Sequence, residues 1–474
     1  MSSRRMRWGT RLTAAVGAIV LAAVGAIVGA APASADTTPP LANIDPSATG
    51  SIIVHKYSEP TDGGGAPNAG GVTTTVPTGA NPLSGVTFDV QQVQGIDLTT
   101  NAGWTTASGL SVTPAGTVTD GATTYTLASA TTQTTDGTGM ATFDSLPLGV
   151  YLVTEGTDTG SNNIVAPAVP FLVTVPMPNA GEWNYTVNAY PKNAVQGQPT
   201  MAVDDSAAHK LGDHVTWTVT STVPTLNTGG TFPDFVLTDA FDSRLDYVEL
   251  TSVTLGGTDV PETDYSTTAP DSANGNTLTI TFNTTYMSQT ASQGKVLAVT
   301  IDTTVTAIGN GTISNVASVN GVDSNSMTTT WGSLIVQADG ADGAHPLQGA
   351  VLGVYLATGD PSCDPIGTKI EPQTSDANGL ATWPGLKAGS YCVQQISAPA
   401  GWTADPDAYL VTVTAGTAAT TAATVTDTQA AGFTLPMTGA AGTVTFTIVG
   451  LALLAGGMAL VLATRRRAVG RKAQ

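Results

Sequence analysis

The sequence predicts an all-β fold of three β-sandwich domains in tandem, and three observations support this prediction. The chain has 474 residues, enough for about three domains of ordinary size. It contains 53 Gly and 28 Pro, and no long apolar stretch with helical spacing lies between its two ends. Short runs of alternating apolar and polar residues recur along it, separated by turn residues. These features argue against an α-rich or α/β enzyme.

The N-terminus, residues 1–35, has the three parts of a secretory signal peptide. Four Arg precede residue 12, an apolar run extends from Leu12 to Ala31, and Ala33-Ser34-Ala35 forms a small-x-small exit. A transmembrane anchor is the alternative. The Thr- and Pro-rich sequence that follows favours cleavage after Ala35, so the chain is expected to be exported.

The exported chain is expected to divide into three blocks and a tail, at residues 36–193, 194–331, 332–428 and 429–474. Alternation typical of half-buried strands occurs in each block, for example at residues 52–56, 86–90, 215–219, 278–282, 334–336 and 409–413. Gly50–Lys56 parallels Gly332–Ala338, and Gly149–Glu155 parallels Gly389–Gln395. The first and third blocks therefore look like copies of one module, whereas the second differs.

Charge is distributed unevenly along the chain. The formal net charge is −19, but most of the basic residues lie at the two ends. Between residues 12 and 464 only seven basic residues face all 35 acidic ones. A surface this acidic repels nucleic acid, so no nucleic-acid partner is expected.

The C-terminal tail contains Leu435, Pro436, Met437, Thr438 and Gly439, then an apolar run from 444 to 463, then three consecutive Arg. About 20 apolar residues can span a bilayer as a helix, and the Arg cluster would stay on the cytoplasmic side. This order of parts resembles the cell-wall sorting signal of Gram-positive surface proteins. The resemblance implies that a sortase cuts between Thr438 and Gly439; a permanent single-span protein is the alternative.

Two further segments resemble motifs of sortase-assembled major pilins. Trp183–Asn193 (WNYTVNAYPKN) is similar to the pilin motif, and Tyr391–Trp402 (YCVQQISAPAGW) is similar to the E-box. The resemblance implies three Ig-like domains of the Cna B type. It also implies that the Lys192 amine, expected at an exposed strand end, attacks the Thr438 acyl-enzyme of another copy. A solvated surface lysine is the alternative for Lys192.

Domains of this family often carry an internal Lys–Asn isopeptide bond, assisted by a buried carboxyl group. Burial favours the neutral amine and the neutral acid, which then polarises the amide carbonyl. The first block keeps Lys56 and Glu155 in phase with apolar neighbours. Asn188 is the candidate acceptor, although its alternation points it away from the core. A buried Lys–Glu ion pair is the equal alternative to a cross-link.

The second and third blocks depart from this pattern. In the second block, Asp239 and Asn315 match the family segments, but Met201 stands where the lysine is expected. Lys210, in a polar turn, is a poor substitute.

In the third block the three reactive positions are Ala338, Gln395 and Asp427. No isopeptide bond is therefore predicted in either block. The two cysteines of the chain, Cys363 and Cys392, both lie in the third block, and in an exported protein such a pair predicts a disulfide.

The favoured function is the repeating shaft subunit of a covalent, peptidoglycan-anchored surface pilus that supports adhesion or biofilm. A monomeric wall-anchored adhesin or minor pilin is the second hypothesis. A wall-anchored enzyme is the third, but the chain has four His and no HExxH or GxSxG motif. No metal or cofactor is expected. The resemblance implies pilus-specific and housekeeping sortases, other copies of the chain, minor pilins and peptidoglycan as partners.

Overall fold

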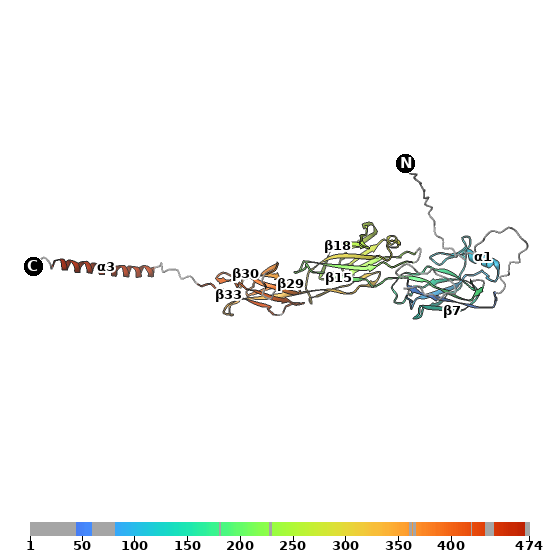
Figure 1. The fold of residues 1–474 in the computed structure, drawn as a ribbon, viewed down its shortest axis with the longest axis horizontal. Coiled ribbons are helices and arrows are strands. Elements are labelled where there is room, and N and C mark those ends of the chain that lie inside the picture. The colour runs from blue at the N-terminus through green and yellow to red at the C-terminus, as the bar shows by residue number, and fades with distance from the viewer. Residues whose placement is uncertain are drawn as a thin grey trace, which may run out of the picture. The chain divides into compact units, whose positions relative to one another are not determined.

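The computed structural model describes residues 44–58, 81–179, 182–226, 230–359, 363, 366–418, 420–431 and 440–469. The chain divides into two compact units. The first contains residues up to Gly332 together with Gly385–Lys387 and Ala415–Thr417, and the second contains the remainder. Along the chain the strands fall into three groups, and helix α3 (Ala440–Val469), labelled in Figure 1, comes after them in the sequence. The described chain is mostly β-strand, as the sequence predicts. The signal peptide lies outside the described residues.

The N-terminal group forms a sandwich around an apolar core. One sheet has the order β13-β1-β7 and the other β10-β8-β3-β6. Ile52 and Phe143 from the first sheet meet Phe88 and Val153 from the second in a single buried cluster. The elements of this group are β1 (Gly50–His55), β2 (Tyr57–Ser58), β3 (Thr87–Gln92), α1 (Asn101–Gly109), β4 (Ser111–Val112), β5 (Val118–Thr119), β6 (Thr131–Thr134), β7 (Met140–Leu146), β8 (Gly149–Glu155), β9 (Ile164–Ala166), β10 (Phe171–Val175), β11 (Met177–Asn179), β12 (Glu182–Asn184), β13 (Thr186–Ala189) and β14 (Lys192–Val195).

Helix α1 is a feature of this group that the sequence pattern does not predict. Thr100 caps it by accepting a hydrogen bond from the backbone N–H of Gly103 at 3.0 Å. Trp104 of the helix stacks on Trp183 with ring centroids 5.2 Å apart. The helix therefore covers a second, smaller apolar cluster that includes Val93 and Leu98.

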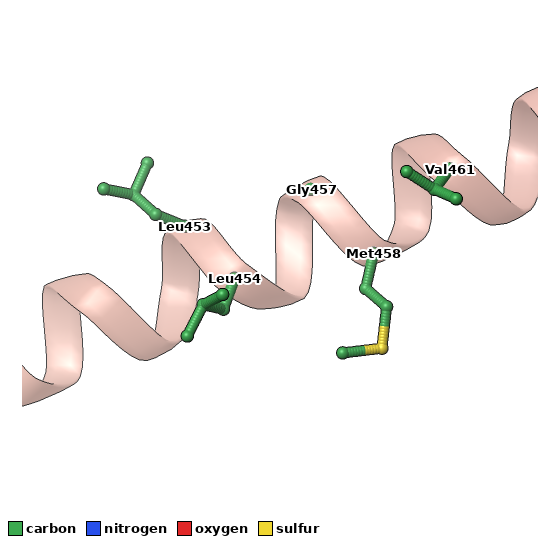
Figure 2. Close-up of a pocket in the computed structure, with 5 residues that line it drawn as sticks. All are labelled: Leu453, Leu454, Gly457, Met458 and Val461. Carbon is green, nitrogen blue, oxygen red and sulfur yellow. The ribbon is translucent and has the colours of Figure 1, made fainter.

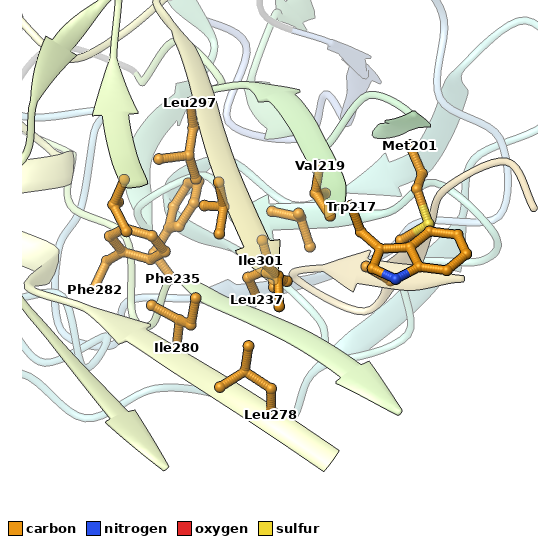
Figure 3. Packing of buried hydrophobic residues seen from close by; sticks show 14 of the residues in the cluster. Met201, Trp217, Val219, Phe235, Leu237, Leu278, Ile280, Phe282, Leu297 and Ile301 are labelled. Atoms are coloured by element: carbon orange, nitrogen blue, oxygen red, sulfur yellow. The ribbon is translucent and has the colours of Figure 1, made fainter. Parts of the chain in front are cut away.

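The middle group is a larger sandwich, with sheets ordered β15-β16-β22-β18-β19 and β20-β21-β17-β24-β25. Strict alternation along β16 and β22 places Trp217 and Ile301 on the core face. They belong to the same buried cluster as Phe235 and Phe282, and Figure 3 shows Trp217 beside Met201. The buried Trp217 indole donates a hydrogen bond to the Thr303 hydroxyl at 3.0 Å. The elements are β15 (Thr200–Asp204), β16 (His214–Thr222), β17 (Val236–Ala240), β18 (Leu245–Leu255), β19 (Thr258–Asp259), η1 (Glu262–Asp264), β20 (Tyr265–Thr268), β21 (Thr277–Phe282), α2 (Thr284–Met287), β22 (Val296–Val305), β23 (Thr312–Asn315), β24 (Ala317–Val319) and β25 (Val322–Asp323).

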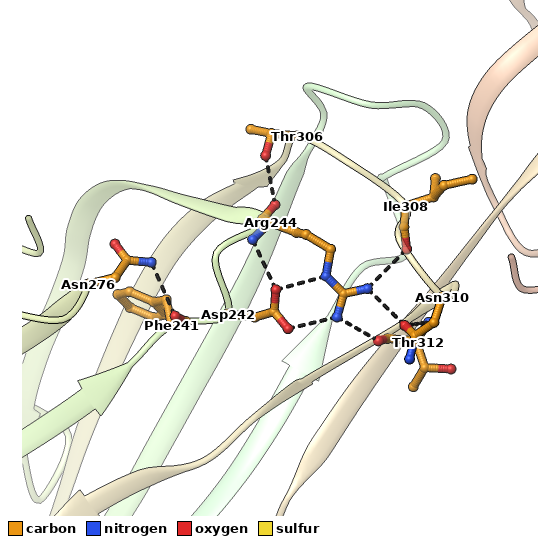
Figure 4. Close-up of polar contacts among 8 residues, drawn as sticks. All are labelled: Phe241, Asp242, Arg244, Asn276, Thr306, Ile308, Asn310 and Thr312. Carbon is orange, nitrogen blue, oxygen red and sulfur yellow. Dashed lines mark hydrogen bonds and ion pairs between the residues drawn. The ribbon is translucent and has the colours of Figure 1, made fainter. Parts of the chain in front are cut away.

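A single arginine joins two loops of the middle group. The guanidinium of Arg244 donates to both carboxylate oxygens of Asp242, at 2.8 and 2.7 Å. It also donates to the Ile308 and Thr312 carbonyls and to the Asn310 side chain, as Figure 4 shows. Hydrogen bonding to Arg244 lowers the pKa of Asp242. These satisfied contacts indicate a structural role for Arg244.

The third group pairs a β28-β27-β30-β32 sheet with a sheet built on β26, β33, β31 and β29. β26 is unusual because its first residues pair with β23 of the middle group and its last with β33. The predicted boundary between residues 331 and 332 therefore falls inside one strand. The strands are β26 (Met327–Gly340), β27 (Val351–Leu356), β28 (Lys369–Thr374), β29 (Leu380–Lys387), β30 (Gly389–Ser397), β31 (Trp402–Thr403), β32 (Ala408–Val413) and β33 (Ala423–Gln429).

The predicted disulfide between Cys363 and Cys392 is present. Their Cα atoms lie 5.8 Å apart, and 29 positions separate the two cysteines in the sequence. Cys392 is in β30, so the bond ties the loop that follows β27 to the middle of a core strand.

A helix, α3, forms where the sequence analysis predicts the apolar span. Among the residues described, however, no helix is both long and apolar enough to cross a membrane. The span itself therefore stays a prediction. Figure 2 shows a shallow depression on this helix, lined by Leu453, Leu454, Gly457, Met458 and Val461. All five come from one helix, so the depression is a side of that helix and not a cleft between elements.

Candidate functional site

The N-terminal group brings a buried lysine, a glutamate and an asparagine together. Lys56 follows Ile52 and Val54 in the inward alternation of the first strand, so its side chain enters the core and is 0% exposed. β14 runs parallel to β2, and this ladder brings Asn193 to the same place. Glu155, the last residue of β8, completes the group from the opposite sheet.

The three side chains contact one another directly. The Lys56 amine donates to Glu155 Oε2 at 2.9 Å and makes a very short contact with Asn193 Oδ1. The Asn193 amide nitrogen donates to Glu155 Oε1 at 2.5 Å. Glu155 also accepts a hydrogen bond from the backbone N–H of Ala168 at 3.0 Å. The centroid of the Phe88 ring lies 5.6 Å from Lys56 Nζ, so an aromatic ring covers the amine on the side that faces the apolar core.

This geometry suits formation of an amide bond between Lys56 and Asn193. The amine nitrogen lies against the asparagine amide, and the carboxyl group bridges both partners. Attack of the amine on the Asn193 carbonyl carbon would form a C–N bond and expel the amide nitrogen as ammonia, with Glu155 carrying the protons. The same contacts without reaction form a buried ion pair with an amide neighbour.

Asn188, the acceptor expected from the sequence, is not part of this group, and that assignment is corrected. Asn188 lies on the other face of β13, where its Oδ1 is 2.8 Å from His55 Nε2. Pro191 does not end the ladder, because the parallel register of β1 with β13 continues unchanged from β2 to β14. Continuing the inward alternation from Val187 by steps of two leads to Asn193. The alternation in the sequence is therefore sufficient to place Asn193 on the core face.

Lys192 lies next to the acceptor in the chain, on the opposite face of β14. It pairs with Tyr57 and is only 3% exposed. The expectation of an exposed strand end is therefore wrong, because Pro191 interrupts the strand for two residues without ending the ladder.

The corresponding position of the middle group holds a carboxyl group without a lysine. The Asn315 amide nitrogen donates to Asp239 Oδ2 at 3.0 Å, and both residues are buried. Burial raises the pKa of Asp239 to about 7. Met201 is buried in the apolar core, as Figure 3 shows, and Lys210 makes its backbone hydrogen bond to Asp213. Without an amine, these residues cannot form the amide bond.

The third group has a buried pair of polar side chains at the corresponding position, but none of the three residues there is a lysine or an asparagine. Gln395 donates to Asp427 Oδ2 at 3.0 Å, and the buried Ala338 stands at the lysine position. Ala338 supplies no amine, so these three residues cannot form the amide bond; the absence of a cross-link in this group stays a prediction.

The sorting motif, Leu435 to Gly439, lies outside the described residues. No cluster of His, Cys, Asp or Glu suited to a metal ion occurs in the part of the chain that the structure describes.

Four segments of the chain match known protein families. Residues 47–194 match the Gram-positive pilin subunit D1, N-terminal domain, and residues 196–340 match the Sgo0707 N2 domain. Residues 332–429 match a prealbumin-like fold domain. Residues 427–468 match the LPXTG cell wall anchor motif.

The whole chain is similar to named fimbrial proteins. It is 30% identical to the fimbrial subunit type 2 of Actinomyces naeslundii, over 97% of this chain and 97% of that protein. It is also 30% identical to the fimbrial subunit type 1 of Actinomyces viscosus, over 99% of this chain and 100% of that protein.

Solved structures share the fold. The full-length major pilin SpaD from Corynebacterium diphtheriae is 25% identical, with a TM-score of 0.62 over 82% of this chain and 99% of that chain. The major pilin SpaA from the same organism is 21% identical, with a TM-score of 0.54 over 80% of this chain and 100% of that chain.

Proposed function

Because this chain belongs to the family of sortase-assembled major pilins of Gram-positive bacteria, we propose that its copies are joined through Lys192 and Thr438. The chain is a shaft subunit of a cell-wall-anchored surface pilus and a sortase substrate. The observation that carries the linkage is the full-length similarity to fimbrial subunits, combined with an anchor motif at residues 427–468.

The proposed linkage is a balanced acyl transfer. The sortase cysteine attacks the Thr438 carbonyl, and the amide bond to Gly439 breaks as the Gly439 amine leaves. The Lys192 amine of another copy then attacks the thioester, so that a C–N bond forms and the C–S bond breaks. The amine's proton passes to the departing thiolate. The chain is thus a substrate of this transfer, as expected for a member of a structural pilin family.

Partners follow from this role. A pilus-specific sortase would join copies and attach minor pilins, and a housekeeping sortase would transfer the finished fibre to peptidoglycan. Adhesion or biofilm formation is the proposed use of the fibre.

Lys192→Ala tests the linkage. Wall extracts of the unmutated strain should give a ladder of high-mass bands on a denaturing gel, and this variant should give monomer alone. Lys295→Ala, which removes an exposed lysine of the middle group, is the matched control and should keep the ladder. A ladder that survives Lys192→Ala would reject the linkage.

The alternative, a monomeric adhesin or minor pilin, is favoured by one observation, the burial of Lys192. It predicts a single monomer band from the unmutated strain, so the same gel distinguishes the two functions.

We also propose that Lys56 and Asn193 form an internal isopeptide bond. Their contact geometry with Glu155 supports it, and the ion pair is the alternative. One bond should lower the intact mass of the exported chain by about 17 Da, the mass of one ammonia. Asn193→Ala should remove this loss, whereas the matched control Asn188→Ala should keep it. A full-mass unmutated chain would favour the ion pair.

A further inference from the structure

The N-terminal group has a buried polar row on the face of the ladder opposite to the Lys56 site. We call His55, Tyr57, Asn188, Tyr190 and Lys192 the outer row. β1/β13 and β2/β14 share one parallel register, in which Tyr57 lies opposite Lys192. The other three residues have the same alternation. Side chains two positions apart on a strand share a face, so the row is continuous.

The outer row is packed, unlike an ordinary solvent-facing strand surface. Tyr190 is 6% exposed and His55 9%. Their rings stack with centroids 4.6 Å apart and planes 12° from parallel. Asn188 holds the imidazole through the 2.8 Å contact with Nε2. Tyr190 is two residues before Lys192 and lies on the same side of the ladder.

This packing conflicts with the chemistry that Lys192 has to perform. Acyl transfer requires the amine nitrogen to reach a thioester carbonyl held in another protein. A lysine that is 3% exposed is not accessible to such a partner. The outer row must therefore open before an amide bond can form.

The hydroxyl of Tyr190 indicates the point at which the outer row opens. Within the described residues this buried hydroxyl has no hydrogen-bond partner. A buried hydroxyl without a partner is unfavourable, whereas water would satisfy it once the ring moves outward. The unpaired hydroxyl of Tyr190 therefore destabilises the closed row, and outward movement of the ring removes this destabilisation. The stack on His55 opposes the outward movement.

We propose that the stacked pair of His55 and Tyr190 gates Lys192: the stack holds Tyr190 against the lysine, and its separation exposes the amine. Both are positioning residues that act through Lys192. This inference rests on the proposed linkage, because the gate has a purpose only where Lys192 is the nucleophile.

Site-resolved acetylation of the folded, exported chain with sulfo-N-hydroxysuccinimide acetate, read by mass spectrometry, tests the gate. His55→Gln removes the ring but keeps a polar group. It should raise the acetylation rate of Lys192 about threefold or more, the worth of one stacked ring pair. Lys295 and Lys369, both exposed, should react at unchanged rates and serve as internal references.

Two variants separate gating from general damage. His55→Phe keeps a ring to stack on Tyr190 and should return Lys192 to the unmutated rate. His214→Gln alters an exposed histidine of the middle group and should change nothing. Tyr190→Leu removes the stack from the other side and gives the same test if His55→Gln does not fold.

Equal Lys192 rates in His55→Gln and the unmutated chain would overturn the gate. An equal increase in His55→Gln and His55→Phe would also overturn it. The assay needs no sortase, so its result is independent of the linkage. If no branched peptide joining Lys192 to Thr438 is found in fibres, the proposed linkage is rejected, whereas the acetylation result for the gate is unaffected.

Discussion

At the scale of single residues, Asp239 is the most unusual group in the middle domain. It is 0% exposed, Asn315 is the hydrogen-bond partner of its carboxyl group, and burial raises its pKa to about 7. In the unfolded chain the same carboxyl ionises near its ordinary value of 3.8. Between these two values the folded state holds a proton that the unfolded state releases.

This difference predicts that the middle domain loses stability as pH rises. The free energy of unfolding should fall between about pH 4 and pH 7, by a few kcal/mol in all, and then level off. Asp239→Asn should remove this fall, because the amide is neutral in both states. Calorimetry of the exported chain at several pH values measures the effect.

The matched control for this prediction is Asp246→Asn, which changes an exposed carboxyl group of β18. It should leave the pH dependence as it is. A middle-domain transition that is equally flat between pH 4 and pH 7 in the unmutated chain would show that Asp239 does not hold its proton.

The reactive residues also show what sequence reasoning can reach. Lys56 and Glu155 were identified because each follows apolar residues in a clear alternation. Asn193 lies just beyond Pro191, a residue type that usually marks a strand end, but the backbone continues its register across that proline. The burial of Lys192 depends on side chains from another strand, which local alternation does not report.

At the scale of elements, the disulfide is the principal covalent constraint within the third domain. It closes a loop with a sequence separation of 29. We predict that Cys363→Ser/Cys392→Ser lowers the free energy of unfolding of this domain by about 3–4 kcal/mol in the chain-entropy model. Calorimetry should show the third-domain transition shifted downward and the other transitions unchanged.

Reduction of the unmutated chain provides the control for the disulfide, since it should reproduce the transition of the double variant. If neither treatment moves the transition, the bond contributes nothing to the stability of the third domain.

Elements with strong alternation were predictable, and those defined by context were not. The runs at 215–219 and 278–282 became β16 and β21. Helix α1 is not predictable from its sequence, NAGWTTASG. This segment contains two glycines, and it lacks an apolar stripe with helical spacing. β26 was read as starting near residue 332, but it begins at Met327, because strand pairing continues across the expected boundary.

At the scale of the whole molecule, composition and terminal motifs were sufficient for the class of fold and of protein. The Gly- and Pro-rich, short-strand pattern predicted the β architecture, and the family comparisons agree with the pilin motif at residues 183–193 and with the sorting signal. Composition could not indicate which domains have the residues for a cross-link, because that depends on one lysine in each.

The missing lysines determine how a fibre built from these subunits bears tension. In a shaft joined as proposed, pulling force enters each subunit at residue 192 and leaves at residue 438, so it passes along the backbone of the second and third sandwiches. Neither has an amine at the position where a covalent brace could join its strands. Under sufficient load we expect these two sandwiches to unfold and so lengthen the fibre. The segment between Cys363 and Cys392 would not extend, because the disulfide closes it.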